Sequence, residues 1–170
     1  MRTTTRIRRL CAATCAAPLL VLAGAAGAGA ATVTVPANTP NVLQATPSEI
    51  LSLVNAERAK ANCPALKENG DLTKAAQVFA DDAAKNNLTN HTGSDGSSAS
   101  QRVKDTGYKV NESIGVGENM AWGSSTDAKT IVDGWIKSPG HHGNMVNCSY
   151  VDTGVAVSGK YAVQVFASPA

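Results

Sequence analysis

Three histidines are the side chains of this sequence whose type and spacing most clearly allow joint chemistry. His91 lies in a polar loop, and the pair His141-His142 follows a Ser-Pro-Gly break. Two imidazoles can hold a late transition-metal ion such as Zn²⁺, with a carboxylate or water completing its coordination. Adjacent residues on a helix point about 100° apart, so at most one of His141 and His142 can share a site with His91.

Glu118 is the acid best placed to join the histidines, because it lies in the largely apolar run Gly117–Trp122. A lone glutamate is rarely buried without a partner. We therefore predict that Glu118 faces a histidine as a metal ligand, as the outer partner of a ligand or as a general base. The alternative is a carboxylate that only hydrogen-bonds to backbone or to a nearby Lys or Arg.

Other catalytic signatures are missing from the sequence. It contains no HExxH motif, no GxSxG nucleophile elbow and no glycine pattern for nucleotide phosphates. Ser138 precedes His141 by only three residues, and this spacing does not indicate a catalytic dyad. These absences favour a binding protein over an enzyme.

Amphipathic patterns predict the helices that position these residues. Residues 46–49 (Thr-Pro-Ser-Glu) have the form of a capping box and predict a helix to about Ala61. Asp71 is the predicted N-cap of a second helix, whose apolar stripe indicates a core face packed closely through small residues. The stripe comprises Leu72, Ala75, Ala76, Phe79, Ala80 and Ala83. Shorter helices are expected over residues 100–105 and 126–137.

Alternating apolar residues predict the strands. Gly117–Trp122 is expected to be a strand that carries Glu118. Residues 151–166 alternate on both sides of a Gly-Lys turn and predict a β-hairpin. Helices and strands mix without strict βαβ alternation, which favours an α+β layered domain.

The N-terminus has the form of a secretory signal peptide. Residues 1–30 combine four arginines, a short apolar run and a small-residue end. Four of the fifteen Lys and Arg residues lie there with no acid, which leaves eleven basic against thirteen acidic residues in the mature chain. Residues 31–45 are predicted to be a short exposed leader. We expect a secreted, extracellular protein with no membrane span, and the lack of a basic block argues against nucleic-acid binding.

Removal of the signal peptide on export also changes the number of cysteines that can form a disulfide bond. Cys11 and Cys15 leave with the signal, so Cys63 and Cys148 remain, 85 residues apart. An exported chain with two cysteines most simply forms one disulfide bond, and two free buried thiols are the alternative. The chain-entropy model gives such a bridge about 4 kcal/mol at best.

The order of motifs from Ile50 to Phe166 resembles the CAP superfamily, also called the SCP domain, in its bacterial secreted branch. That family includes cysteine-rich secretory proteins, antigen 5 and plant pathogenesis-related proteins. The matching stretches are Val54–Arg58, Leu72–Ala76, His91–Gly96, Gly117–Ala121, Trp135–His141 and Gly154–Val157. The resemblance implies that residues 46–168 form a CAP/SCP domain, an α-β-α sandwich with a central antiparallel-rich sheet.

The resemblance also implies an open cleft lined by two histidines and two acids that can bind a divalent metal. Carried over by position, His91, His141 and Glu118 are the implied metal ligands, with Zn²⁺ as the implied ion. Ser138 lines the cleft where animal and plant members carry the second acid. His142 stands where bacterial members carry arginine, and we expect it to be exposed.

We expect a non-enzymatic binding module whose cleft takes a small ligand, a lipid or an extracellular partner protein. One alternative is a metal-dependent hydrolase in which the two histidines hold the ion and Glu118 is the base toward bound water. The other is a disulfide-stapled scaffold that contacts cell wall or host proteins. Core packing is the expected role of Met120 and Trp122, with lining of an apolar groove as the alternative. We expect a monomer.

Overall fold

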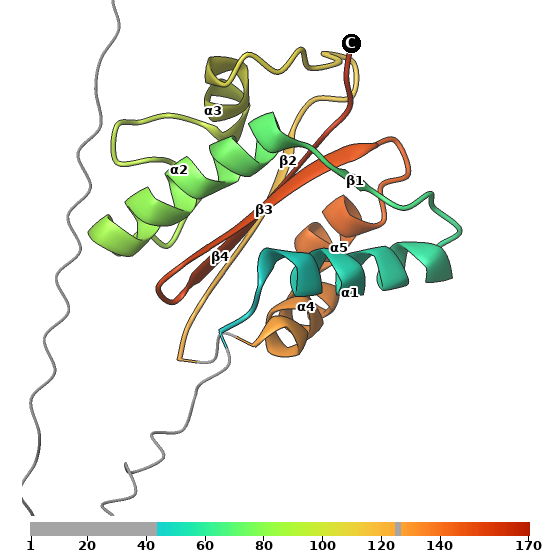
Figure 1. Cartoon of the computed structure of the whole chain (residues 1–170), viewed down its shortest axis with the longest axis horizontal. Helices are drawn as coiled ribbons and strands as arrows, with labels where there is room; N and C mark the ends of the chain where they lie inside the picture. Colours follow the sequence, from blue (N-terminus) through green and yellow to red (C-terminus); the bar gives the residue numbers. More distant parts are fainter. Residues whose placement is uncertain (1–43, 125–126) are drawn as a thin grey trace, which may run out of the picture. The chain divides into compact units, whose positions relative to one another are not determined.

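A four-stranded sheet lies between two layers of helices in the computed structural model of the chain, which describes residues 44–124 and 127–170 (Figure 1). The strands are β1 (Lys67–Glu68), β2 (Gly117–Trp122), β3 (Asp152–Ser158) and β4 (Tyr161–Ala167), in the spatial order β1-β3-β4-β2. β1 pairs with β3 in parallel, and the other two pairings are antiparallel. The predicted α-β-α sandwich with an antiparallel-rich sheet is confirmed.

The helices divide between the two faces of the sheet. One face is covered by α2 (Gly70–Asn86) and α3 (Ala99–Asp105), and the other by α1 (Pro47–Lys60), α4 (Ala128–Lys137) and α5 (Pro139–Met145) (Figure 1). Each face has its own buried apolar cluster. The predicted signal peptide of residues 1–30, and the predicted leader through residue 43, lie outside the described residues.

The N-caps of α1 and α2 show one confirmed and one wrong prediction. In the capping box of α1, the Thr46 hydroxyl accepts from the Glu49 N–H, and the Glu49 carboxylate accepts from the Thr46 N–H at 2.9 Å. In α2 the cap is Asn69, whose Oδ1 accepts from the N–H groups of Asp71 at 2.9 Å and Leu72 at 3.3 Å. The prediction of Asp71 as the N-cap is wrong because Asn69 offers equivalent capping chemistry two residues earlier.

The small-residue face of α2 lies directly on β3 and β4. All six residues of the predicted stripe are buried, as expected for a core face. Gly154 of β3 makes the close approach possible, because a Cβ atom there would overlap the backbone of Leu72 and Thr73. A side chain at Gly154 would therefore push the helix off the sheet.

The order of strands leaves β2 at an edge of the sheet. β3 and β4 form the predicted hairpin. β2 pairs with β4 alone, with Gly117 opposite Phe166 and Trp122 opposite Tyr161. The sequence did not predict β1, because two exposed residues carry no alternation that a pattern could reveal. The unpaired side of β2 faces toward α4 and α5, which position the candidate site.

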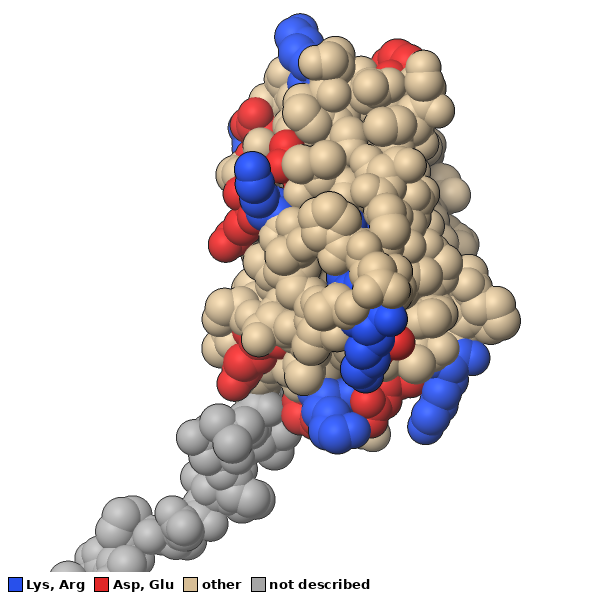
Figure 2. All heavy atoms as spheres, turned by 90° about the vertical axis from the view of Figure 1, so that its right-hand side faces the viewer, with Lys and Arg blue, Asp and Glu red and all other residues tan. Residues whose placement is uncertain are grey.

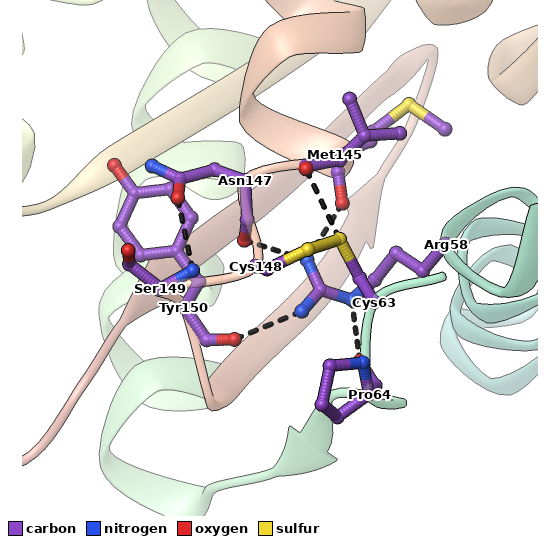
Figure 3. Close-up of a disulfide and its surroundings, with 9 residues drawn as sticks. Arg58, Cys63, Pro64, Met145, Asn147, Cys148, Ser149 and Tyr150 are labelled. Atoms are coloured by element: carbon purple, nitrogen blue, oxygen red, sulfur yellow. Dashed lines mark hydrogen bonds between the residues drawn. A yellow bond between two sulfur atoms is a disulfide. The ribbon is translucent and has the colours of Figure 1, made fainter. Parts of the chain in front are cut away.

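A disulfide bond and a buried arginine join the end of α1 to the segment after α5 (Figure 3). Cys63 and Cys148 form the bridge, as predicted. Arg58 is completely buried, and its guanidinium donates to four backbone carbonyls. These belong to Pro64 at 2.9 Å, Met145 at 2.7 Å, Asn147 at 2.9 Å and Tyr150 at 2.9 Å. The sequence did not predict this role, because an arginine in the last turn of a helix usually interacts with the helix end from the surface.

Charged side chains of both signs are spread over the surface. On the face drawn in Figure 2, Lys and Arg lie close to Asp and Glu near the periphery, and a broad middle area carries neither. That face therefore offers no single-signed block for a polyanion. Among residues 44–124 and 127–170, no helix combines the length and the apolar character needed to cross a membrane.

Candidate functional site

Glu118 connects a histidine to an arginine near the start of β2. Its side chain is 3% exposed, and its Oε1 lies 2.8 Å from Nδ1 of His91. Nη2 of Arg102 donates to both carboxylate oxygens, at 3.0 Å to Oε1 and 2.8 Å to Oε2. The structure thus brings together two of the predicted site residues, His91 and Glu118. It also shows that the second partner of Glu118 is an arginine.

Arg102 reaches this carboxylate from α3 and is itself buried, with its side chain 5% exposed. It also donates to the carbonyls of Ser97 at 2.8 Å and His91 at 3.3 Å. Its guanidinium carbon lies 3.8 Å from the centroid of the Phe79 ring, within the range of a cation–π contact. One guanidinium therefore fixes both Glu118 and the loop that carries His91.

This chain of contacts decides the orientation of the His91 ring. A carboxylate only accepts hydrogen bonds, so Nδ1 of His91 carries the hydrogen that Glu118 accepts. The neutral ring then has its lone pair on Nε2. The His91 side chain is 49% exposed, whereas Glu118 and Arg102 lie buried behind it. Glu118 therefore orients His91 rather than facing solvent itself.

α5 brings His141 to the same end of β2. The helix begins at Pro139, where the sequence predicts a break, and its first turn carries His141. The His141 carbonyl accepts from Nδ2 of Asn119 at 3.0 Å. Nδ2 of Asn144 donates to the Glu118 carbonyl at 3.2 Å and to Oδ1 of Asn119 at 2.9 Å. These bonds fix α5 against the strand.

The two adjacent histidines of α5 point to different partners. The His141 ring faces the His91 ring, with centroids 6.3 Å apart and planes tilted by 58°. Burial lowers the pKa of His141, and the neighbouring His91 lowers it further, so the ring favours its neutral form. His142 turns toward α1, where its Nε2 lies 3.1 Å from Oε1 of Glu57. His142 was expected to be exposed and is partly covered, with its side chain 36% exposed.

The two facing imidazoles are the groups that could hold a divalent metal. Tetrahedral Zn²⁺ bound by two imidazoles places their centroids about 5 Å apart, so His91 and His141 fit after a small approach. Glu118 lies buried behind His91 and accepts hydrogen bonds from His91 and Arg102, and its role as a third direct ligand stays a prediction. It fits the role of an outer partner that orients a histidine ligand.

Acidic and sulfur ligands do not complete such a centre. Within the part of the chain that the structure describes, no group of three or more His, Cys, Asp or Glu side chains could hold a metal. The metal site with His91, His141 and Glu118 therefore stays a prediction.

A groove of about 360 Å³ lies between β2 and α4 and reaches the first turn of α5. We call it the β2–α4 groove. It is lined by Met120, Ala121, Trp122, Thr130, Ile131, Gly134, Trp135, Ser138, His141 and Lys160. The lining is mostly apolar and contains no acid. Ser138 and His141 belong to it, whereas His91 and Glu118 do not.

The two tryptophans of the chain line this groove in different ways. Trp135 is 1% exposed, and its Nε1 donates to the Met120 carbonyl at 3.2 Å. Trp122 is 48% exposed. Core packing was expected for Met120 and Trp122. Met120 is buried as well as lining the groove, but the expectation is wrong for Trp122, which ends an edge strand beyond the cover of α4 and α5.

Neither the histidine pair nor the β2–α4 groove contains an activated nucleophile. The Ser138 hydroxyl makes no hydrogen bond to any other described residue, so no base is placed to activate it. Glu118 is held by Arg102 behind His91, away from the groove. The site therefore combines an imidazole oriented by Glu118, that of His91, with a mostly apolar groove that His141 lines.

Several residues of this site were not predicted from the sequence. Arg102 has no local signal, since an arginine on a short helix normally extends into solvent. Asn119 does carry one, because a polar amide inside a buried strand needs hydrogen-bond partners. That requirement could have indicated the contact between β2 and α5.

Comparison with known proteins identifies similar chains. The model of the cysteine-rich secretory protein family, CAP, matches residues 51–167. Membrane protein YlbC of Bacillus subtilis (strain 168), itself uncharacterized, is 29% identical over 118 residues, which are 69% of this chain and 33% of that protein. YkwD of the same organism, also uncharacterized, is 30% identical over 118 residues, 68% of this chain and 44% of that protein. The chain thus spans less than half the length of both relatives.

A solved structure shows the same fold. It is an extracellular protein containing an SCP domain from Bacillus anthracis str. Ames, with a TM-score of 0.66 and 26% sequence identity. The match covers 71% of this chain and 39% of that protein. The similarity therefore concerns one domain of a longer molecule.

Proposed function

Because the chain belongs to the cysteine-rich secretory protein (CAP) family, we propose that it is a secreted, non-enzymatic binding module. Its binding site is the β2–α4 groove, and its ligand is a small molecule with an apolar part. The observation that carries this proposal is the groove itself, about 360 Å³ in volume, beside the oriented histidine pair.

The size and lining of the groove support this function. Small-molecule pockets typically occupy about 300–1,000 Å³ and combine an apolar lining with a few convergent polar groups. Here Ala121, Ile131 and Trp135 supply apolar surface, and Ser138 and His141 supply polar groups at one end. A small ligand fits this volume better than a long lipid chain does.

The hydrogen bonds of Glu118 favour ligand binding over hydrolysis. A hydrolase at this site would use Glu118 as its base, but Arg102 accounts for both oxygens of that carboxylate. A bound divalent metal remains part of the proposal, held by His91 and His141, where it would supply positive charge and Lewis acidity. The facing rings support it.

The extracellular location is also a proposal. It is supported by the signal-like N-terminus and by the Cys63–Cys148 disulfide, a bond that persists in oxidising compartments. The similar protein of Bacillus anthracis is described as extracellular. The relative YlbC is described as a membrane protein.

The chain's own tryptophans allow a direct test. Both Trp122 and Trp135 line the groove, so small apolar probes of each charge can be titrated while tryptophan emission is recorded. A Cβ atom added at Gly134 would meet no atom within 4 Å, so Gly134→Phe should fill the groove without disturbing the core. We expect binding to weaken about tenfold or more in this variant, which corresponds to about 1.4 kcal/mol.

Gly143→Phe is the matched control. It lies on α5, also has no atom within 4 Å of an added Cβ, and does not line the groove. It should bind the probes as the original chain does. If no probe binds, or if Gly134→Phe binds as well as Gly143→Phe, the proposed function is wrong.

A further inference from the structure

We propose that the ligand of the β2–α4 groove is a small apolar carboxylate, whose anionic end lies toward Lys160 and the outward N–H groups of β2. The inference rests on the proposed function and specifies its ligand class. It is carried by three features of the groove, which are its charge, its unmatched donors and its apolar floor.

The charge of the groove is positive. Lys160 lines it from the β3–β4 turn, and no Asp or Glu lines it. The Lys160 ammonium lies 5.6 Å from the centroid of the Tyr161 ring, which places the cation beside the end of the sheet. A ligand with one negative charge complements this lining, whereas a cation would meet no carboxylate among its described residues.

The exposed edge of β2 adds backbone donors. The Gly123 N–H donates to the Lys160 carbonyl, and bonds in an antiparallel pair alternate along the strand. Every second residue counted back from Gly123, which means Ala121, Asn119 and Gly117, therefore bonds to β4. The N–H and C=O groups of Trp122 and Met120 point away from β4. Both of these residues line the groove.

Side chains of the protein donate to two of the outward carbonyls of this edge. The Met120 carbonyl accepts from Trp135, and the Glu118 carbonyl accepts from Asn144. No side chain in the described part of the chain accepts from the N–H of Met120 or Trp122. The N–H groups of an open strand edge pair with water in the free protein, so a ligand that displaces this water must supply acceptor oxygens. A carboxylate has acceptors only.

The remaining lining suits an apolar body. Ile131 and Trp135 are buried on this face of the sheet, Ala121 is partly buried beside them, and Trp122 presents an exposed indole. Transfer of apolar surface from water to such a floor is worth about 25 cal/mol per Å². The volume of about 360 Å³ limits this body to a compact group. These features together select a carboxylate on a short apolar or aromatic frame.

A matched set of probes tests the charge directly. Phenylpropionate, phenylpropionamide and phenylpropylamine share one frame and carry a negative, a neutral and a positive end. Titrations followed by tryptophan emission should give the tightest binding for phenylpropionate, by about tenfold over the amide, and the weakest for the amine. Lys160→Gln should reduce the ratio of the phenylpropionate affinity to the phenylpropionamide affinity to about one.

Lys137→Gln is the control, because Lys137 is an exposed lysine of α4 that does not line the groove. It should keep the preference for phenylpropionate. Equal binding of the three probes, tighter binding of the amine, or a preference that survives Lys160→Gln would overturn this inference while the proposed function stands. Failure of all three probes to bind would also contradict the proposed function.

Discussion

The two sides of β2 treat their polar groups in opposite ways. On the side of α2 and α3, the Glu118 carboxylate is buried and receives hydrogen bonds from His91 and Arg102. On the side of α4, the N–H groups of Met120 and Trp122 point away from β4, and both residues line the β2–α4 groove. A buried carboxylate with both oxygens paired is held in one arrangement, whereas backbone donors beside an open groove can pair with a ligand. His91, Glu118 and Arg102 therefore orient the site, and the mostly apolar residues of the β2–α4 groove form the proposed binding surface.

Mutation of the buried contact between Glu118 and Arg102 should have the largest effect on stability. Arg102→Met leaves Glu118 buried without its guanidinium, and breaking a buried pair in this way typically costs about 3–5 kcal/mol. We expect a loss of that size in the free energy of unfolding, measured by urea titration. Lys104→Met on the same helix removes only the exposed pair with Glu112, so its effect should stay within about 1 kcal/mol. Similar losses of unfolding free energy in the two variants would contradict the expected difference between the buried and the exposed ion pair.

The disulfide should contribute to stability without shaping the groove. Replacing Cys63 and Cys148 together by Ser should lower the free energy of unfolding by about 2–4 kcal/mol. The chain should still fold, because Arg58 holds the carbonyls on both sides of the bridge independently of it (Figure 3). Urea titration measures the first effect. Tryptophan titration with phenylpropionate should show unchanged affinity, and a loss of affinity in the folded variant would show that the bridge shapes the groove.

Zn²⁺ titrations of single-residue variants distinguish direct metal ligands from a residue that only orients a ligand. In calorimetric titrations with Zn²⁺, we expect His91→Ala and His141→Ala each to remove detectable binding. Glu118→Gln should weaken binding by only about 10–100-fold, because Glu118 orients a ligand without being one. Circular dichroism of the Glu118→Gln variant checks that it is folded. Equal Zn²⁺ binding by His91→Ala and the original chain would exclude the histidine site.

The smallest expected effect is a pH dependence from His141. Its pKa is lower in the folded chain than its ordinary value of 6.5, so the unfolded chain binds more protons between the two values. The resulting stability is present above pH 6.5 and is lost as the pH falls through the folded pKa. Urea midpoints of His141→Gln should fall less on acidification than those of the original chain. His142→Gln is the control and should keep the original slope, whereas an equal change in both variants would refute the assignment.

Sequence patterns predicted the framework because its causes are local. The capping box at Thr46, the buried stripe of α2 and the alternation of the hairpin each depend on residues close in sequence. The disulfide followed from counting cysteines in an exported chain. These features therefore appear in a single sequence.

The chemistry of the site was less predictable because its causes are distant in sequence. Arg102 meets Glu118 only after α3 packs beside α2, and the polar contacts of Asn144 arise only when α5 docks on β2. Exposure of Trp122 depends on the strand order, which leaves β2 at an edge. The groove is a product of packing, and no run of residues encodes it.

The central claim is that ligand binds on the α4 side of β2 and leaves the His91–Glu118–Arg102 network unchanged. The most direct measurement is an amide and side-chain NMR titration of the full mature chain with phenylpropionate. We predict saturable shifts of the Met120 and Trp122 amides and the Trp135 indole N–H, with no shift of the Arg102 guanidinium signals. Shifts confined to the Arg102 network, or to residues that do not line the groove, would contradict the account.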